Sequence, residues 1–313
     1  MNFLRRIFKK ELPVKTESVK FSYQNQEVLK DISLNLKERE MVAIIGKSGS
    51  GKSTFLKLLC GVLGKKYQGK IRIFGQNKFL QKNQIGFVPQ EISMIPDLSI
   101  EDNIKIAGLN LGIKEKDAIK KADELMEMLK INEDIKKFPS QLSGGQKVRL
   151  NIVLSILHNP KILILDEPFV GLDFLNRRIL WHFLETMKKQ DKSIILTSHL
   201  LTETQEHVDR LIILKNGKIF FSGQIEKLKE KLKFQFIYEL KLAKLSKQNF
   251  QKIKKYCDFK DIKILDYNEK YLMFAIATNT QKIYINKLFE KLNLDYKEIG
   301  FREPNLDEVF LGA

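Results

Sequence analysis

A glycine-rich loop carries the strongest chemical signal in this chain. The stretch GKSGSGKST lies between an apolar run at 41–46 and a helical pattern at 52–63. It matches G-x-x-x-x-G-K-[ST], in which backbone N–H groups wrap phosphates, the lysine reaches the β- and γ-phosphates, and the final hydroxyl binds Mg²⁺. The strand–loop–helix context predicts a nucleotide phosphate site formed by Gly46, Lys47, Ser48, Gly49, Ser50, Gly51, Lys52, Ser53 and Thr54.

Two adjacent acids follow another apolar run, in the stretch ILILDEP. A phosphate loop of this kind needs a strand-end aspartate for its magnesium, and Asp166 stands where the strand should emerge. Glu167 adds a second carboxylate there, well placed to polarise a water for attack on the γ-phosphate. The alternative for Glu167 is a solvated strand-end acid, which Pro168 disfavours because it fixes the chain beyond.

A second glycine-rich motif, LSGGQ, contains Ser143, Gly144, Gly145 and Gln146 directly before a helical run. Unpaired N–H groups and the helix dipole make such a helix start a favourable anion site. A simple helix cap is the alternative. It accounts for Ser143, but on sequence grounds it leaves the two glycines and Gln146 unexplained.

The remaining patterns indicate an α/β fold. Half-buried antiparallel strands are expected at 18–23 and 31–36 with a turn at 25–27, an amphipathic helix at 114–130, and a helix near 174–189. Short apolar strands alternate with these helices, which predicts a largely parallel sheet with helices on both faces. These strands are expected at 41–46, 70–75, 85–90, 161–168, 193–199 and 210–223.

The motifs stop after Gly223. A charged stretch at 225–233 precedes a predicted strand–helix–strand–strand–helix–strand order, the split β-α-β-β-α-β arrangement. We therefore expect three parts: a basic amphipathic N-terminal segment at 1–13, a nucleotide-binding domain at 14–224, and a linker with a small α+β domain at 225–313.

The motif series resembles the ATP-binding subunit of ABC transporters over roughly residues 14–223. In order, the chain carries the P-loop, Gln90 in FVPQE, LSGGQ, ILILDEP, GLD at 171–173 and His199 in TSH. The resemblance implies a P-loop ABC ATPase fold, with ATP and Mg²⁺ as cofactors. It also implies a head-to-tail dimer, in which each LSGGQ caps the γ-phosphate held by the P-loop of the other chain.

The resemblance also assigns individual roles. Tyr23 would stack on adenine, although a tyrosine also suits a strand end. Gln90 would approach Mg²⁺ and the attacking water and couple them to the membrane partner, and His199 would contact the γ-phosphate. Asp173 would lie at the dimer seam. Phe174 departs from the family pattern, because many relatives have proline there.

The expected function is ATP hydrolysis that powers transport by separate integral-membrane permease subunits. The stretches 94–113 and 302–313 resemble the drug and polysaccharide exporter branch, which favours export. The expected location is the cytoplasmic face of the cell membrane, as a peripheral subunit paired with a second copy or a homologous ATPase. The alternatives are a soluble ABC-type ATPase acting on nucleic acid or ribosomes, and a regulatory module without turnover, which Glu167 and His199 disfavour.

Composition sets further bounds. The formal net charge is +17, yet the basic residues are spread along the chain rather than gathered in one stripe, so no specific nucleic-acid partner is expected. The two cysteines have no metal-ligand spacing, and no apolar run approaches the roughly 18–20 residues that span a bilayer. Apolar and basic residues of the stretch 2–12 would separate on a helix, which fits either an interfacial helix or a functionless tail.

Overall fold

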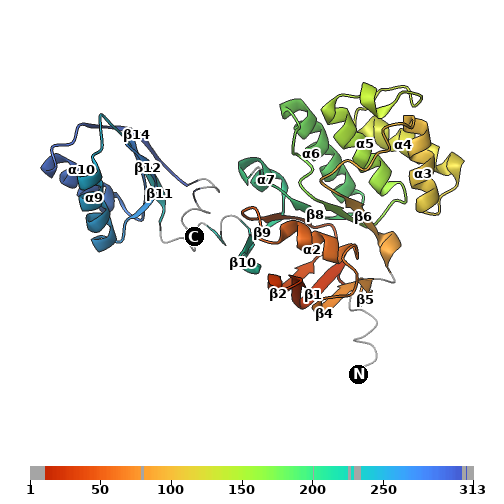
Figure 1. Ribbon diagram of the computed structural model, residues 1–313, viewed down its shortest axis with the longest axis horizontal. Coiled ribbons are helices and arrows are strands. Elements are labelled where there is room, and N and C mark those ends of the chain that lie inside the picture. Colours follow the sequence, from red (N-terminus) through yellow and green to blue (C-terminus); the bar gives the residue numbers. More distant parts are fainter. Residues whose placement is uncertain are drawn as a thin grey trace. The chain divides into compact units, whose positions relative to one another are not determined.

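The computed structural model describes residues 11–78, 81–199, 201–224, 227–228, 234–304 and 308 (Figure 1). The chain divides into two compact units, which we call unit 1, ending at Gly223, and unit 2, beginning at Gln224. The predicted N-terminal helix at 2–12 lies outside the described residues except for its last two positions. Most of the exporter-like ending at 302–313 also lies outside them.

The described part of unit 1 contains a six-stranded sheet. Its strands are β3 (Met41–Ile45), β6 (Ile85–Val88), β7 (Ile162–Leu165), β8 (Ser193–Thr197), β9 (Arg210–Lys215) and β10 (Lys218–Gly223). They lie in the order β10-β9-β3-β8-β7-β6, and all neighbours are parallel except β10 and β9. Every residue of β3, β7 and β8 is buried, because the sheet is covered on both faces. The predicted largely parallel sheet is confirmed for its other strands, but the strand expected at 70–75 is not part of it and pairs antiparallel in a second sheet.

An antiparallel sheet packs beside it in unit 1. Its strands are β1 (Val14–Tyr23), β2 (Gln26–Leu36), β4 (Gln68–Ile73) and β5 (Gln76–Asn77), in the order β2-β1-β4-β5. The turn expected at 25–27 is wrong, because β2 already begins at Gln26. Gln24 adopts a left-handed φ of 48°, which allows a two-residue turn to join the strands.

The helices of unit 1 match the predicted pattern with one shortening. They are α2 (Lys52–Leu59), α3 (Ile100–Asn110), α4 (Glu115–Met128), α5 (Gly144–Ile156), α6 (Phe174–Lys189) and α7 (Leu201–His207), with 3₁₀ turns at Lys82–Gln84 and Pro139–Gln141. The helix expected at 52–63 ends at Leu59, because Gly61 turns the chain with a left-handed φ of 78°. Figure 1 shows α3, α4 and α5 packed together as a helical group.

Unit 2 has the predicted β-α-β-β-α-β order. Its elements are β11 (Phe236–Leu242), α9 (Lys247–Phe259), β12 (Lys263–Asn268), β13 (Tyr271–Ile276), α10 (Asn279–Lys291) and β14 (Tyr296–Arg302). The strands form an antiparallel sheet in the order β12-β13-β11-β14. Ile253 and Cys257 of α9 and Ile285 and Phe289 of α10 are buried in one core with residues of this sheet. Unit 2 therefore has its own hydrophobic core.

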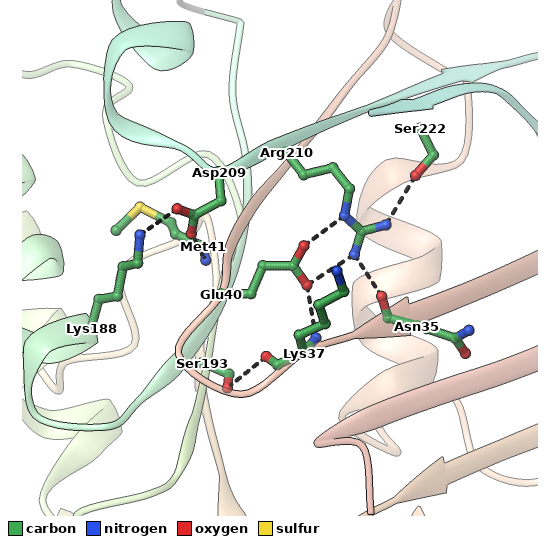
Figure 2. A network of polar contacts seen from close by, with 9 residues as sticks. All are labelled: Asn35, Lys37, Glu40, Met41, Lys188, Ser193, Asp209, Arg210 and Ser222. Carbon is green, nitrogen blue, oxygen red and sulfur yellow. Dashed lines mark hydrogen bonds and ion pairs between the residues drawn. The ribbon is translucent and has the colours of Figure 1, made fainter. Parts of the chain in front are cut away.

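A polar network ties the turn between β2 and β3 to β9 and β10 (Figure 2). The Arg210 guanidinium donates to both carboxylate oxygens of Glu40, at 2.7 and 3.0 Å, and to the Ser222 hydroxyl at 2.9 Å. Glu40 also accepts the backbone N–H of Lys37 at 2.7 Å. The Glu40 side chain is only 9% exposed, so these donors offset the cost of burying a carboxylate.

We predict that Arg210→Met lowers the unfolding free energy of unit 1 by about 2–3 kcal/mol, because a mostly buried carboxylate loses its cation. Urea unfolding followed by Trp181 fluorescence measures it, since this tryptophan is buried in unit 1 and is the only one in the sequence. Arg72→Met, at an exposed position on β4, is the control and should change stability by less than about 0.5 kcal/mol. Equal effects of the two substitutions would contradict the prediction.

Candidate nucleotide-binding and catalytic site

The P-loop lies between the end of β3 and the start of α2. Its geometry requires glycine at two positions in particular. Gly51 adopts a left-handed φ of 103°. A Cβ on Gly46 would lie 2.4 Å from the Leu214 carbonyl oxygen, so the packing leaves no room for a side chain. The loop backbone is therefore held in a tight wrap directly before the helix, where N–H groups can bind an anion.

Lys52 lies across this loop. Its ammonium donates to the carbonyl oxygens of Gly46 at 2.8 Å and Lys47 at 3.4 Å. Burial lowers the pKa of Lys52, while the charges of Glu167 and Asp166 oppose that effect. The Ser50 hydroxyl is buried and has no hydrogen-bond partner among the described residues. A buried cation and an unsatisfied hydroxyl in one loop fit an anionic, oxygen-rich ligand.

Asp166 joins three segments that are distant in sequence. It follows β7 and is 2% exposed. The hydroxyl of Ser53, at the start of α2, donates to its Oδ1 at 3.0 Å. The hydroxyl of Thr197, at the end of β8, donates to the same oxygen at 2.8 Å. The hydroxyl and carboxylate oxygens are of the type that Mg²⁺ prefers.

Glu167 lies in an unusual backbone conformation beside this cluster. Its φ is 52°, in the left-handed region, and its N–H donates to the Thr197 hydroxyl oxygen at 2.8 Å. The carboxylate contacts His199 Nε2 at 2.7 Å and the Gln90 amide nitrogen at 3.5 Å. Glu167, Thr197 and His199 line a pocket of about 200 Å³, which is large enough for water. Strained backbone of this kind is concentrated at functional sites.

Thr197 is a site residue that the sequence motifs do not indicate. The motif TSH gives a role to His199, yet the Thr197 side chain hydrogen-bonds to both Asp166 and Glu167. A signal was present, because Thr197 ends an apolar strand of the kind that ends at Asp166. Which strands are neighbours in the sheet is a tertiary feature, however, and the sequence did not show it.

The LSGGQ residues form the start of α5. The Ser143 hydroxyl accepts the Gln146 N–H at 3.2 Å, and the Gln146 side chain accepts the Ser143 N–H at 2.8 Å. This capping box corrects one expectation, because a helix cap accounts for Gln146 as well as for Ser143. It does not account for Gly144, where an added Cβ would meet no atom within 4 Å.

The LSGGQ residues are not bonded to the P-loop of the same chain in the part of the chain that the structure describes. Among the described residues, no hydrogen bond or ion pair joins residues 143–146 to residues 46–54. Gln146 instead donates to Glu133 at 2.7 Å, and α5 belongs to the helical group of Figure 1. Within the described residues, the two glycine-rich motifs of one chain therefore share no hydrogen bond or ion pair.

Tyr23 lies at the end of a strand, and Asp173 lies at the start of a helix. Tyr23 ends β1, is 44% exposed, and packs edge-on against Phe21 with ring centroids 4.8 Å apart. Asp173 caps α6 by accepting the Asn176 N–H at 2.8 Å. Phe174, the departure from the family pattern, is 61% exposed.

The fold and the site together define a P-loop nucleoside triphosphatase. The sequence pattern of the ABC transporter family matches residues 29–170. The chain is 33% identical to an uncharacterized ABC transporter ATP-binding protein of Methanocaldococcus jannaschii, MJ1023, over 71% of this chain and 81% of that protein. It is 29% identical to the linearmycin resistance ATP-binding protein LnrL of Bacillus subtilis, over 95% and 97% of the two chains.

Solved structures agree. A dimeric bacterial ABC transporter cassette, MJ0796, is 28% identical and aligns with a TM-score of 0.62 over 68% of this chain and 98% of that one. The chain belongs to the ATP-binding proteins of ABC transporters, and it is an ATP-hydrolysing enzyme of that family. The similarity to LnrL extends through unit 2, whereas MJ1023 matches a shorter part of the chain.

We predict that Thr197→Val lowers the unfolding free energy of unit 1 by about 1–3 kcal/mol, because it leaves the Glu167 N–H without its partner and removes a donor to Asp166. Valine keeps the shape of the side chain. Urea unfolding followed by Trp181 fluorescence is the measurement.

Thr186→Val is the matched control, because that hydroxyl donates only within its own helix, to the His182 carbonyl at 2.8 Å. It should change stability by less than about 0.5 kcal/mol. If the two valine variants unfold at the same urea concentration, the Thr197 hydroxyl does not hold the site together.

Proposed function

We propose that the P-loop of this chain binds the phosphates of ATP through its backbone N–H groups and Lys52. The ammonium exchanges the Gly46 and Lys47 carbonyls for β- and γ-phosphate oxygens. The Ser50 hydroxyl, buried without a partner among the described residues, gains one from the ligand. Because burial lowers the Lys52 pKa, the phosphate charge also stabilises its protonated form. Lys47, Ser48, Gly49, Gly51 and Thr54 complete the loop, and Tyr23 stacks on the adenine.

Ser53, Asp166 and Gln90 are the residues that would hold Mg²⁺. The 3.0 Å contact between Ser53 Oγ and Asp166 Oδ1 supports this assignment, because both oxygens already converge on one place. Bound there, the ion would neutralise charge on the β- and γ-phosphates.

Glu167 is the general base in this proposal. The observation that carries it is the position of its carboxylate, between His199 at 2.7 Å and Gln90 at 3.5 Å, one residue beyond Asp166. The carboxylate polarises a water and receives its proton as the water attacks the γ-phosphate in line. His199 orients the carboxylate and contacts the γ-phosphate, while Lys52 stabilises the charge that develops on the transferred group.

The second glycine-rich motif serves a second chain. Ser143, Gly144, Gly145 and Gln146 would cap the γ-phosphate held by the P-loop of a partner ATPase, so that two chains form two composite sites head to tail. The open space at Gly144 supports this arrangement, and so does the absence of recorded bonds to the P-loop among the described residues of this chain. Asp173 would lie at the seam between the chains. The solved structure of the MJ0796 cassette is dimeric, which supports a dimer.

The work of ATP hydrolysis is transport, through integral-membrane permease subunits that are separate chains. In the described part of this chain, no helix has the length and apolar character needed to cross a bilayer. The name of LnrL associates that relative with linearmycin resistance, which supports an exporter. The chain would then act at the cytoplasmic face of the membrane, with an ATP-binding domain at 14–224 and a smaller domain at 225–313.

We predict that Glu167→Gln keeps ATP binding and lowers turnover by about 100-fold or more, because glutamine has the shape of the carboxylate but cannot accept the proton. ATP should then hold two chains together, which size-exclusion chromatography with ATP and Mg²⁺ would detect. Lys52→Ala differs, because it should weaken ATP binding itself. A Glu167→Gln chain with wild-type turnover would remove Glu167 from this role.

Mixed dimers test the head-to-tail arrangement. When one chain carries Ser143→Arg and its partner carries Lys52→Ala, both defects fall on one composite site and the other site is built from normal groups. We expect this dimer, isolated with two different affinity tags, to bind one ATP tightly.

The crossed control places both substitutions in one chain and pairs it with a wild-type chain. Each composite site then carries one defect, so tight ATP binding should be lost. If instead each chain built its own site, the two results would be exchanged. ATP binding is the deciding measurement, because turnover at two sites can be coupled.

A further inference from the structure

A pocket of about 470 Å³ lies where strands β3, β7 and β8 of the six-stranded sheet begin. These strands are parallel, so their first residues lie together at this end of the sheet, and Asp166 and Thr197 lie at the opposite end. The walls come from the turn before β3, from Lys161 directly before β7, and from the connection between α6 and β8. Its volume is within the range of small-molecule sites. None of the residues assigned to ATP or Mg²⁺ lines it.

More cationic than anionic side chains line the pocket. Arg39, Lys161 and Lys192 line it, together with the carboxylates of Glu38 and Asp191. Arg39 and Asp191 bind each other at 2.6 Å, and both side chains are about two-thirds exposed. Glu38 is exposed on the same turn as Arg39. Lys161 and Lys192 lie on the β7 and β8 side of the pocket, and among the described residues no ion pair joins either lysine to a carboxylate.

Lys192 is the unusual member of this pair. It is 9% exposed, and its ammonium donates to the backbone carbonyl of Asn159 at 3.2 Å and to its side-chain oxygen at 2.7 Å. Both acceptors are neutral. Burial lowers the Lys192 pKa, the charges of Lys121 and Lys161 lower it further, and Asp191 opposes them only in part. An anion would offset the cost of this buried charge, and an ammonium has a third N–H to donate to it.

The turn that forms the facing wall is fixed by bonds within the protein. The Ser193 hydroxyl accepts the Arg39 N–H at 3.1 Å and donates to the Lys37 carbonyl at 3.1 Å. Figure 2 shows how the same turn is anchored at its other end, where Glu40 binds Arg210. The pocket wall is therefore formed before any ligand arrives, which lowers the entropic cost of binding.

An apolar surface completes the pocket. Pro13 and the Phe74 ring contribute to the lining, and the Lys161 ammonium stands 5.5 Å from the centre of that ring. A flat apolar group can lie against the ring while a charged group attached to it reaches the lysines. The apolar and the cationic parts of the pocket are thus close enough for one small molecule to contact both.

We propose that this pocket binds a small organic oxyanion, with its phosphate or carboxylate group bonded to Lys161 and Lys192 and a flat apolar group against Phe74. The site is separate from the nucleotide site, and it does not depend on the roles proposed for Glu167 or LSGGQ. Its ligand is a single molecule of the size of a substituted aromatic acid or phosphate ester.

Calorimetric titration of the full chain tests this proposal, with the P-loop saturated by Mg²⁺ and a non-hydrolysable ATP analogue so that phosphates cannot bind there. The probes are phenyl phosphate, benzoate and inorganic phosphate. We expect one phenyl phosphate or benzoate per chain and weaker binding of inorganic phosphate, because it lacks the ring. The comparison of phenyl phosphate with benzoate identifies the preferred charged group.

Lys161→Met should weaken binding of the preferred probe by about tenfold or more, since a charge-assisted bond is lost. Lys161 is exposed, so this variant should fold normally, and Lys192→Met provides a second, buried test. Lys189→Met, at an exposed position near the end of α6, is the control and should bind as the wild type does. The proposal is overturned if no probe binds at millimolar concentration, if inorganic phosphate binds as tightly as the aromatic probes, or if Lys161→Met binds like the control.

Discussion

The Asp166 carboxylate connects the separate segments that form the nucleotide site. A buried carboxylate without donors would cost several kcal/mol, so the chain must supply hydrogen bonds to it. Two of them come from hydroxyls that reach the same oxygen, Ser53 at the start of α2 and Thr197 at the end of β8. The P-loop helix and the two strands β7 and β8 are therefore held at one point. The position of the P-loop relative to the acids follows from this contact.

The same contact separates the roles of two adjacent acids. Asp166 faces inward and is surrounded by hydroxyl donors. Glu167 turns away from it through a left-handed backbone, which the Thr197 hydroxyl holds by accepting the Glu167 N–H. Its carboxylate then faces His199 and Gln90 instead of the oxygen cluster. Thr197 thus helps to position both acids: Asp166, whose surroundings suit a cation, and Glu167, whose surroundings suit a water.

The two ends of the six-stranded sheet differ in chemistry because its parallel strands all begin at one end and finish at the other. Parallel strands place all their carboxyl ends on one side, where binding sites of open α/β sheets usually lie. They also place all their amino ends on the other side, and here that edge is closed by turns that carry Arg39, Lys161 and Lys192. The network of Glu40 and Arg210 fixes one of those turns. The hydrogen bonds that hold this turn in place for the fold also give the pocket a wall that is formed without a ligand.

Sequence alone determined the features that depend on neighbours along the chain. The P-loop spacing, the acids at 166 and 167, the bounds of α6 and the β-α-β-β-α-β order of unit 2 were all readable, because local periodicity and caps specify them. The resemblance to ABC transporter ATP-binding subunits rested on the same local motifs. The helix at 52–63 was too long and the turn at 25–27 was misplaced, because single left-handed residues, Gly61 and Gln24, set those ends.

Only the tertiary structure determined which segments meet. It showed that Thr197 bonds to both acids and that Lys192 is buried beside other lysines. Both features depend on the order of strands in a sheet or on the packing of a turn, which the sequence does not show. The cap formed by Ser143 and Gln146 is different, because the two residues are three positions apart and S-x-x-Q is a local capping pattern. The sequence names the groups that can do chemistry, and the burial and strand order of the fold determine which of them act together.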